Sequence, residues 1–195
     1  MTLSEELYQS YVIAQSTLQT FIEDRSNSDK TAEFSQLLAD SYTHHGKPLI
    51  CGNGGSTCDA MHFSEELTGR FRKNRRALPA IHLGDASHIT CVGNDFGFDE
   101  IFSRGVEAFG SSGDVFIGLS TSGHSENVIR AFNKAKEKQL KTVLLLGKEG
   151  GKLKGLGDLE FVIPGDTADR IQEIHMMILH IAIEGCERLL FPQLY

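Results

Sequence analysis

Two side chains that can exchange protons or hold a metal stand four residues apart in the segment His62-Phe63-Ser64-Glu65-Glu66. If this segment is helical, His62 and Glu66 share one face, because residues four apart are neighbours on a helix surface. An imidazole beside a carboxylate can act as an acid–base pair or as two ligands of one metal ion. The alternative is an ordinary surface pair, but the position of the segment just after a glycine-rich loop favours a functional role.

That glycine loop, Gly52-Asn53-Gly54-Gly55-Ser56, follows a short apolar run and precedes a helix expected from about Thr57. Its glycines let the backbone approach a ligand closely and leave N–H groups exposed. Two nucleotide-binding patterns do not fit, because the dinucleotide fingerprint needs a third glycine at Thr57 and the P-loop needs a Gly-Lys-Ser/Thr sequence. The loop is therefore a candidate substrate site, with a plain strand-to-helix turn as the alternative. Its candidate residues are Asn53, Gly54, Gly55 and Ser56.

A second loop, Ser120-Thr121-Ser122-Gly123-His124-Ser125, places four hydroxyl groups between a strand expected to end at Leu119 and a helix expected from about Glu126. One hydroxyl, that of Ser125, suits the N-cap of the helix, but one cap does not explain four hydroxyls. Hydroxyls, free N–H groups and a helix dipole together form an uncharged cradle for phosphate. We therefore expect Ser120, Thr121, Ser122 and Ser125 to bind a phosphate group, with a merely polar turn as the alternative.

A third set of polar residues interrupts the long apolar helix expected at about residues 168–190. A lone histidine there would usually be a satisfied core residue, since buried polar groups need partners. The combination instead indicates a site, and its members are Asp169, Gln172, His175 and His180. Asn94 and Asp95, between two glycines, could form a turn or reach the hydroxyls of a sugar. The basic run at residues 70–76 is interpreted as a solvated stretch.

Short apolar runs alternate with helical stretches from Pro48 onward, the order typical of a parallel sheet covered by helices on both faces. The expected strands lie at residues 49–51, 80–83, 115–119, 143–146 and 161–163. In such sheets ligands bind outside the carboxyl ends of the strands, where both loops stand. We therefore predict one α/β domain over residues 1–195, with a helical extension at 1–45 and a five-stranded parallel sheet flanked by helices at 46–195.

The extension reads as two amphipathic helices, and the last helix carries apolar residues on more than one face. Those apolar positions are Ile171, Ile174, Ile178, Ile181 and Ile183. A helix that is apolar on several sides is normally buried on several sides, and a chain of 195 residues offers little surface for this. We expect these helices to pack against other subunits.

The composition is that of one ordinary globular domain, with 40% hydrophobic and 23% charged residues. A net charge of −7 argues against nucleic acid as a partner, which would require a basic face. The four cysteines form no CxxC pair, so reduced and mostly buried thiols are expected. No signal peptide and no run of ~20 apolar residues stands out. These features predict a cytoplasmic protein without a membrane partner.

Taken together, the motifs resemble the sugar isomerase (SIS) domain superfamily. The motifs are Cys51-Gly52-Asn53-Gly54-Gly55-Ser56, Leu119-Ser120-Thr121-Ser122-Gly123 and Asp169-Arg170-Ile171-Gln172-Glu173-Ile174-His175. Within that superfamily the chain is similar to the phosphoheptose isomerases. That similarity is carried by Asp59-Ala60-Met61-His62-Phe63-Ser64-Glu65-Glu66-Leu67-Thr68-Gly69-Arg70 and Cys91-Val92-Gly93-Asn94-Asp95-Phe96-Gly97-Phe98. The resemblance covers nearly the whole chain.

The resemblance implies conversion of D-sedoheptulose 7-phosphate to D-glycero-D-manno-heptose 7-phosphate, the entry step to ADP-heptose for the bacterial lipopolysaccharide core. It also implies a homotetramer and one zinc ion per subunit. The family's zinc ligands fall on His62, Glu66, Gln172 and His180. Its phosphate contacts fall on Ser120, Thr121, Ser122 and Ser125, and its other substrate contacts on Asn53, Gly54, Gly55, Asn94 and Asp95. Ser56, Glu66, Asp169 and Gln172 are further candidate substrate contacts.

The chemistry of the implied reaction agrees with the residues. Ketose-to-aldose isomerisation moves a proton between adjacent carbons and stabilises an enediolate, so it needs a base and an acid but no redox cofactor. Glu66 is the expected base and His180 the expected acid. A carboxylate bound tightly to zinc is a poorer base, so the two roles of Glu66 stay open. The alternative is a non-enzymatic regulator of the same superfamily that binds the replication initiator protein, and the presence of both Glu66 and His180 favours the enzyme.

One geometric expectation concerns the last helix. Gln172 and His180 are eight residues apart, so their backbones lie about 12 Å apart along the axis and about 80° apart around it. Ligand atoms lie ~2 Å from a zinc ion, and two ligands of one ion are thus at most about 4 Å apart. We therefore predict that a neighbouring subunit supplies His180 or Gln172 to each site.

Overall fold

The computed structural model describes all 195 residues and contains one five-stranded sheet in which every neighbouring pair of strands is parallel. The strands are β1 (Pro48–Gly52), β2 (Ile81–His82), β3 (Val115–Ser120), β4 (Lys141–Gly147) and β5 (Leu159–Ile163). Their spatial order is β2-β1-β3-β4-β5. The chain therefore leaves β1 towards one edge of the sheet and returns to β3 to build the other, and ligands of such sheets bind where this order reverses. The loops after β1 and β3 flank that point.

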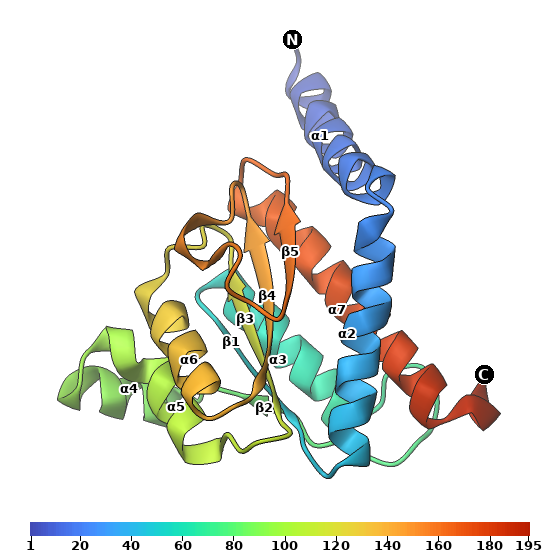
Figure 1. The fold of residues 1–195 in the computed structure, drawn as a ribbon. Helices are drawn as coiled ribbons and strands as arrows, with labels where there is room; N and C mark the ends of the chain where they lie inside the picture. Colours follow the sequence, from blue (N-terminus) through green and yellow to red (C-terminus); the bar gives the residue numbers. More distant parts are fainter.

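Helices cover both faces of the sheet (Figure 1). One face packs against α4 (Ala86–Asp95), α5 (Ile101–Phe109) and α6 (Glu126–Glu137). The other packs against α2 (Ser26–Thr43), α3 (Gly55–Thr68) and α7 (Ala168–Leu190). Three short 3-10 helices lie at Phe98–Glu100, Gly151–Leu153 and Pro192–Leu194. None of the helices combines the length and the apolar character needed to cross a bilayer.

The inner strands β1 and β3 are buried along their whole length because both of their faces are covered. In β3, Ile117 and Leu119 belong to the core beneath α2, α3 and α7, whereas Phe116 belongs to the core beneath α5 and α6. All six residues of β3 are buried. The site is thus held by the most completely buried strands of the molecule, and its loops start from fixed ends.

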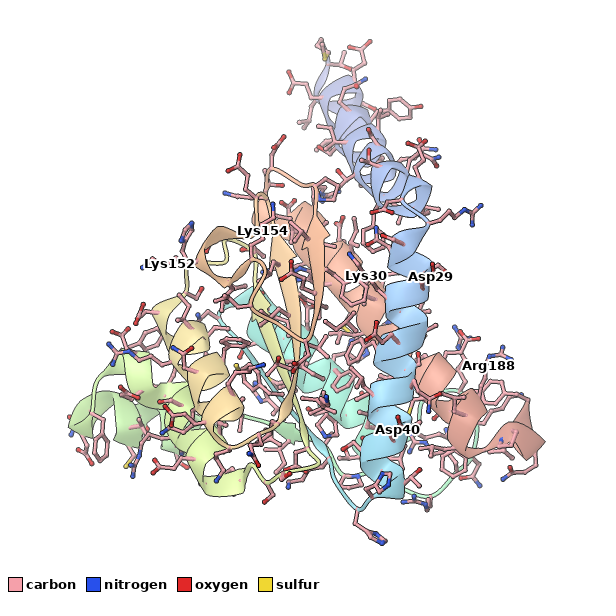
Figure 2. The ribbon with its side chains drawn as sticks, in the orientation of Figure 1. Asp29, Lys30, Asp40, Lys152, Lys154 and Arg188 are labelled. Carbon is pink, nitrogen blue, oxygen red and sulfur yellow. The ribbon has the colours of Figure 1, made fainter.

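The helices differ in how much of their apolar surface the chain itself covers. In α2, Phe34 and Leu38 are buried, while Asp29 and Asp40 point outward (Figure 2). The first helix, α1 (Leu3–Glu23), extends beyond the sheet and buries only Phe21 (Figure 1). Its exposed apolar residues include Leu3, Leu7, Tyr8, Tyr11 and Ile13. An apolar groove of about 510 Å³ lies between α1, α2 and α7 and contains none of the predicted site residues.

The predicted fold class is confirmed, including five parallel strands at the expected places and a last helix at residues 168–190. The helix after the glycine loop starts at Gly55, two residues before the expected position, and α6 starts at Glu126 as expected. Four of the five apolar residues that we placed on several faces of α7 are buried, but Ile181 is 47% exposed. Use of the terminal helices in oligomerisation, and the division at residue 45, stay predictions.

Candidate active site

Helices α3 and α7 bring three ionisable side chains together, which we call the His–Glu cluster: His62, Glu66 and His180. His62 Nε2 lies 3.2 Å from Glu66 Oε1, and His180 Nε2 lies 4.0 Å from the same oxygen. The two imidazole rings meet edge to face with their centroids 4.9 Å apart. One possible ligand atom from each residue lies within 4.8 Å of the others. The spacing of four residues seen in the sequence therefore marks a cluster that a distant helix completes.

The cluster is open to solvent in the single chain. The side chains of His62, Glu66 and His180 are 46%, 17% and 33% exposed. Partial burial and the nearby imidazole of His62 lower the pKa of His180, with Glu66 opposing the shift. His180 is therefore neutral at pH 7, the form in which imidazole binds metals. One side of the cluster thus lacks protein and is free for substrate or for another chain.

Asp59 is a charged group near the cluster that the sequence analysis did not single out. It lies on α3, three residues before His62, and its Oδ2 atom is buried without a hydrogen-bond partner. Burial raises the pKa of Asp59 to about 6, against the opposing effect of His62. The spacing of three residues on one helix face was a signal that could have identified it.

The basic run at residues 70–76 is solvated as expected at Arg70, Arg72, Lys73 and Arg76, but the Arg75 side chain is buried. The phenyl ring of Phe71 stacks on the imidazole of His180 with centroids 5.7 Å apart. Arg72 forms a 2.5 Å ion pair with Glu184, and Arg75 forms a 2.7 Å ion pair with Glu187. Since Glu184 and Glu187 both lie on α7, the segment runs beside that helix. We call residues 71–76 the clasp segment.

The glycine loop is tied to the second loop by a pair of amides. Asn53 and Asn127 each donate a 2.9 Å hydrogen bond from their Nδ2 to the other's Oδ1. Both primary amides are thereby engaged, so the Asn53 side chain ties the glycine loop to the start of α6. Asn127 is almost completely buried on the first turn of α6 and was missed in the sequence.

Gln172, a residue of α7, contacts the start of α3 beside the glycine loop. Its Nε2 is 3.4 Å from Ser56 Oγ, and a Cβ on Gly55 would collide with its amide group. His62 stands six residues after Ser56, about 9 Å further along the helix at 1.5 Å per residue. The structure therefore places Gln172 of this chain at the glycine loop, away from the His–Glu cluster. His180, by contrast, does reach His62 and Glu66 from the same chain.

The second loop, residues 120–125, holds three of its four hydroxyls in hydrogen bonds within the loop. Ser120 Oγ lies 3.0 Å from Ser125 Oγ and accepts a 3.1 Å hydrogen bond from the N–H of Gly123. Ser122 Oγ accepts from the N–H of His124. Ser125 is the N-cap residue of α6 as expected, but its side chain makes no capping hydrogen bond. The N–H of Val128 in the first turn of α6 donates a 2.9 Å hydrogen bond to Asn127 Oδ1. The N–H groups at a helix start are the groups that bind anions, and Ser125 engages none of them through its side chain.

A close contact between glycines holds this loop in shape. Gly123 has φ +65, and a Cβ there would overlap the carbonyl oxygen of Gly150. Gly151 has φ +57, and a Cβ there would overlap the carbonyl oxygen of Ser122. The loop after β3 and the loop after β4 thus press together backbone to backbone.

Other residues singled out in the sequence lie apart from the cluster and the loops. Asn94 and Asp95 are exposed at the end of α4, where the Asn94 amide donates to the carboxylate of Asp95. Asp169 is exposed at the start of α7 and pairs with Arg170. His175 is fully buried, and its Nε2–H donates a 3.0 Å hydrogen bond to the carbonyl of Leu146. Burial lowers the pKa of His175 to about 4, so it is a neutral core residue.

All four cysteines are free. Cys51 and Cys186 are buried, whereas Cys58 and Cys91 are exposed, so the expectation of mostly buried thiols holds for half of them. Burial raises the pKa of Cys186 to about 12. Because a thiol reacts as the thiolate, the two buried cysteines are inert packing residues.

Loops at the switch point of a five-stranded parallel sheet, with hydroxyls at a helix start, are typical of α/β proteins that bind phosphorylated ligands. Residues 10–147 match the family model described as "SIS domain". The phosphoheptose isomerase of Fusobacterium nucleatum is 62% identical over 97% of both chains. That of Escherichia fergusonii is 55% identical over 90% of this chain and 92% of the relative. A solved phosphoheptose isomerase from Neisseria gonorrhoeae superposes with a TM-score of 0.87 at 35% identity, covering 96% of this chain and 98% of the other. The chain therefore belongs to the SIS domain family and, within it, groups with the phosphoheptose isomerases.

Proposed function

We propose that this protein isomerises D-sedoheptulose 7-phosphate to D-glycero-D-manno-heptose 7-phosphate. The observation that carries the proposal is the His–Glu cluster, in which His180 of α7 meets two residues of the helix that begins at the glycine loop, in a chain 62% identical to a phosphoheptose isomerase. The non-enzymatic regulator is not favoured, because the relatives that match the chain at 55–62% identity are named as isomerases. A cytoplasmic location stays a prediction from the sequence.

The 120–125 loop is the proposed phosphate site. It carries four hydroxyls just before the start of α6, those of Ser120, Thr121, Ser122 and Ser125. The N–H groups of a helix start and its positive dipole end attract an anion without needing a lysine. The phosphate then fixes one end of the sugar, and the chain of carbon atoms runs past the glycine loop towards the His–Glu cluster.

The proton transfer is assigned to Glu66 and His180. Glu66 takes the proton from the carbon next to the carbonyl of the ketose, which leaves an enediolate, and the same proton is returned to the neighbouring carbon. His180, kept neutral by its lowered pKa, offers an N–H to the enediolate oxygen. The hydroxyl group next to the ketone loses its proton to become the aldehyde oxygen, and the former ketone oxygen gains a proton to become a hydroxyl group. The atoms therefore balance, and no electron acceptor is required.

A metal ion fits the cluster. Two imidazoles and a carboxylate are ligands that zinc accepts, and side-chain rotations would bring donor atoms that now lie within 4.8 Å of one another to a common ion. We propose one zinc ion per subunit, held by His62, Glu66 and His180 with Gln172 as the fourth ligand. When bound, the ion would polarise the sugar carbonyl.

Gln172 is proposed to come from a neighbouring subunit of a homotetramer. Within one chain it lies at Ser56, whereas His180 already lies beside Glu66. Of the two residues that a neighbour could supply, the single-chain geometry therefore favours Gln172. The exposed apolar residues of α1 and the groove beside α7 offer surfaces on which a second copy could pack. Asn94, Asp95 and Asp169 remain candidate sugar contacts in such an assembly.

The direct test is incubation with sedoheptulose 7-phosphate and detection of heptose 7-phosphate by NMR. Absence of product from zinc-loaded protein would reject the proposed reaction. The shared site is tested by mixing Gln172→Ala and His180→Ala proteins after dissociation and reassociation. Some activity should return, because certain interfaces regain a full set of residues. Mixed oligomers that demonstrably form and stay inactive would reject the shared site while leaving the reaction itself standing.

A further inference from the structure

We propose that Arg75 is a positioning residue that sets the spacing between Glu66 and His180. The inference rests on the proposed function, and it concerns a residue that touches neither the substrate loops nor the cluster side chains. Its basis is the set of contacts that the buried guanidinium makes with the two helices that carry the cluster.

The first contacts close the end of α3. Arg75 donates 2.7 Å from one terminal nitrogen to the carbonyl oxygen of Glu66 and 2.8 Å from the other to that of Leu67. It also donates to the carbonyl of Gly69 at 3.2 Å. The last carbonyls of a helix have no partner inside the helix, and a cation there also suits the helix dipole. Arg75 therefore holds the backbone of Glu66 itself.

The second contact reaches α7. Arg75 Nε donates 2.7 Å to Glu187 Oε1, and both side chains are 0% exposed. Tyr195, near the end of the chain, donates 2.7 Å to the other carboxylate oxygen of Glu187. Glu187 follows His180 by seven residues, close to two full turns, so the two lie on the same face of α7. One planar guanidinium thus joins the turn that carries Glu66 to the face that carries His180.

The clasp segment makes further contacts of this kind along one face of α7. Its residues Phe71, Arg72 and Arg75 contact His180, Glu184 and Glu187 in that order. Contacts at steps of four and three residues follow one face of a helix. A shift of α7 along its axis would break all of them together, so the segment fixes where His180 stands relative to α3.

A buried ion pair is a poor device for stability alone. Removing two charges from water offsets much of their attraction, and apolar side chains of similar size are often as stable. A planar guanidinium that binds a carboxylate and helix-end carbonyls in fixed directions instead supplies geometry. A second ion pair with a buried carboxylate, Lys47 with Asp114, contacts neither α3 nor α7 and therefore provides a matched control.

The test compares Arg75→Lys and Glu187→Gln with Asp114→Asn as full-length proteins. Each is measured for thermal stability, for kcat and KM with sedoheptulose 7-phosphate, and for zinc affinity by competition with a chromophoric chelator. Removing partners that orient metal ligands typically lowers metal affinity or activity about 10- to 100-fold. We expect a loss in that range in both kcat and zinc affinity for Arg75→Lys and Glu187→Gln, with KM within about twofold because the phosphate loop is untouched. Asp114→Asn should lower the melting temperature without either loss.

Unchanged kcat and zinc affinity in folded Arg75→Lys and Glu187→Gln would overturn the proposal, as would equal losses in Asp114→Asn. If both variants fail to fold, Tyr195→Phe removes a single hydrogen bond to Glu187. It should weaken zinc binding about threefold, roughly what a net hydrogen bond of 0.5–1 kcal/mol gives. No change in Tyr195→Phe would then reject the proposal. The zinc measurement needs no turnover, so it separates failure of this inference from failure of the proposed isomerisation.

Discussion

The 120–125 loop and the His–Glu cluster are the two parts of the proposed site, and they are built in opposite ways. The loop contains no acidic or permanently charged side chain, the hydroxyls of Ser120 and Ser125 pair with each other, and glycine contacts lock its backbone. The cluster is made of ionisable side chains on two helices, is partly exposed, and has donor atoms too far apart to be bonded all at once. The loop is therefore stabilised by contacts within one chain, whereas the donor atoms of the cluster are still open to a ligand.

This contrast indicates that phosphate binding and proton transfer depend on different parts of the fold. The loop depends on the ends of buried strands and on a helix start, which single side-chain changes leave intact. The cluster depends on the distance between α3 and α7, which the clasp segment controls. Changes in the loop should therefore alter affinity, and changes in the cluster should alter turnover.

The largest effect is expected from Glu66→Gln. Glutamine keeps the shape of the side chain but cannot accept a proton, and general base catalysis is worth about 10²–10⁴-fold in rate. We expect kcat to fall by about 10²–10⁴-fold while the oligomer stays intact. The matched control is Glu65→Gln on the exposed neighbouring position, which should keep its activity. An active Glu66→Gln enzyme would leave Glu66, at most, as a metal ligand.

A smaller but measurable effect is expected from the buried His175 below the site. Its pKa is lowered to about 4 in the folded chain, against 6.5 for the ordinary group. Between these values the unfolded chain binds the proton more readily, so the stabilisation is full above pH 6.5 and is lost as pH falls towards 4. The shift corresponds to about 3 kcal/mol at most.

Thermal melting between pH 7 and pH 4.5 would measure this contribution. His175→Gln keeps an N–H donor for Leu146 but does not titrate, so its melting temperature should fall less over that range. Parallel curves for the two proteins would show that His175 is not the group responsible. Its hydrogen bond to the carbonyl of Leu146 also anchors α7 to the end of β4, independently of the cluster.

The smallest of the three effects is expected in the loop. Thr121→Ala removes one hydroxyl that is proposed to contact the phosphate, and a hydrogen bond to a charged group contributes roughly 1.5–3 kcal/mol. We expect kcat/KM to fall roughly 10- to 150-fold, mainly through a higher KM. Weaker inhibition by inorganic phosphate would confirm the cause. If kcat falls while KM and phosphate inhibition stay unchanged, the division between binding loop and reacting cluster is wrong.

Local patterns were sufficient to predict the sheet, the two loops and the last helix. Apolar runs ending in glycine or serine predicted β1 and β3, and the four-residue spacing predicted that His62 and Glu66 would face the same way. The contacts that the sequence analysis missed join distant positions. Arg75 and Glu187 are 112 residues apart, and Asn53 and Asn127 are 74 apart. A charged residue in a polar stretch of sequence gives no sign that folding will bury it against a partner on another helix.

The α1 helix shows the other limit of local patterns. Its apolar residues have rough helical spacing, which predicted the helix but not what covers it. In the single chain only Phe21 is buried, so periodicity identified the element while the surface it packs on stayed a prediction.

The backbone contact between Gly123 and the Gly150–Gly151 pair has a consequence for how the protein can evolve. No substitution at Gly123 or Gly151 avoids a collision with a carbonyl oxygen, and the positive φ values penalise every other residue as well. Neither glycine can therefore be replaced through a series of tolerated substitutions. The hydroxyl residues beside them can be substituted, and the cost is a loss of affinity alone. Descendants of this chain could adapt the loop to other phosphorylated ligands, but they would inherit these two glycines unchanged.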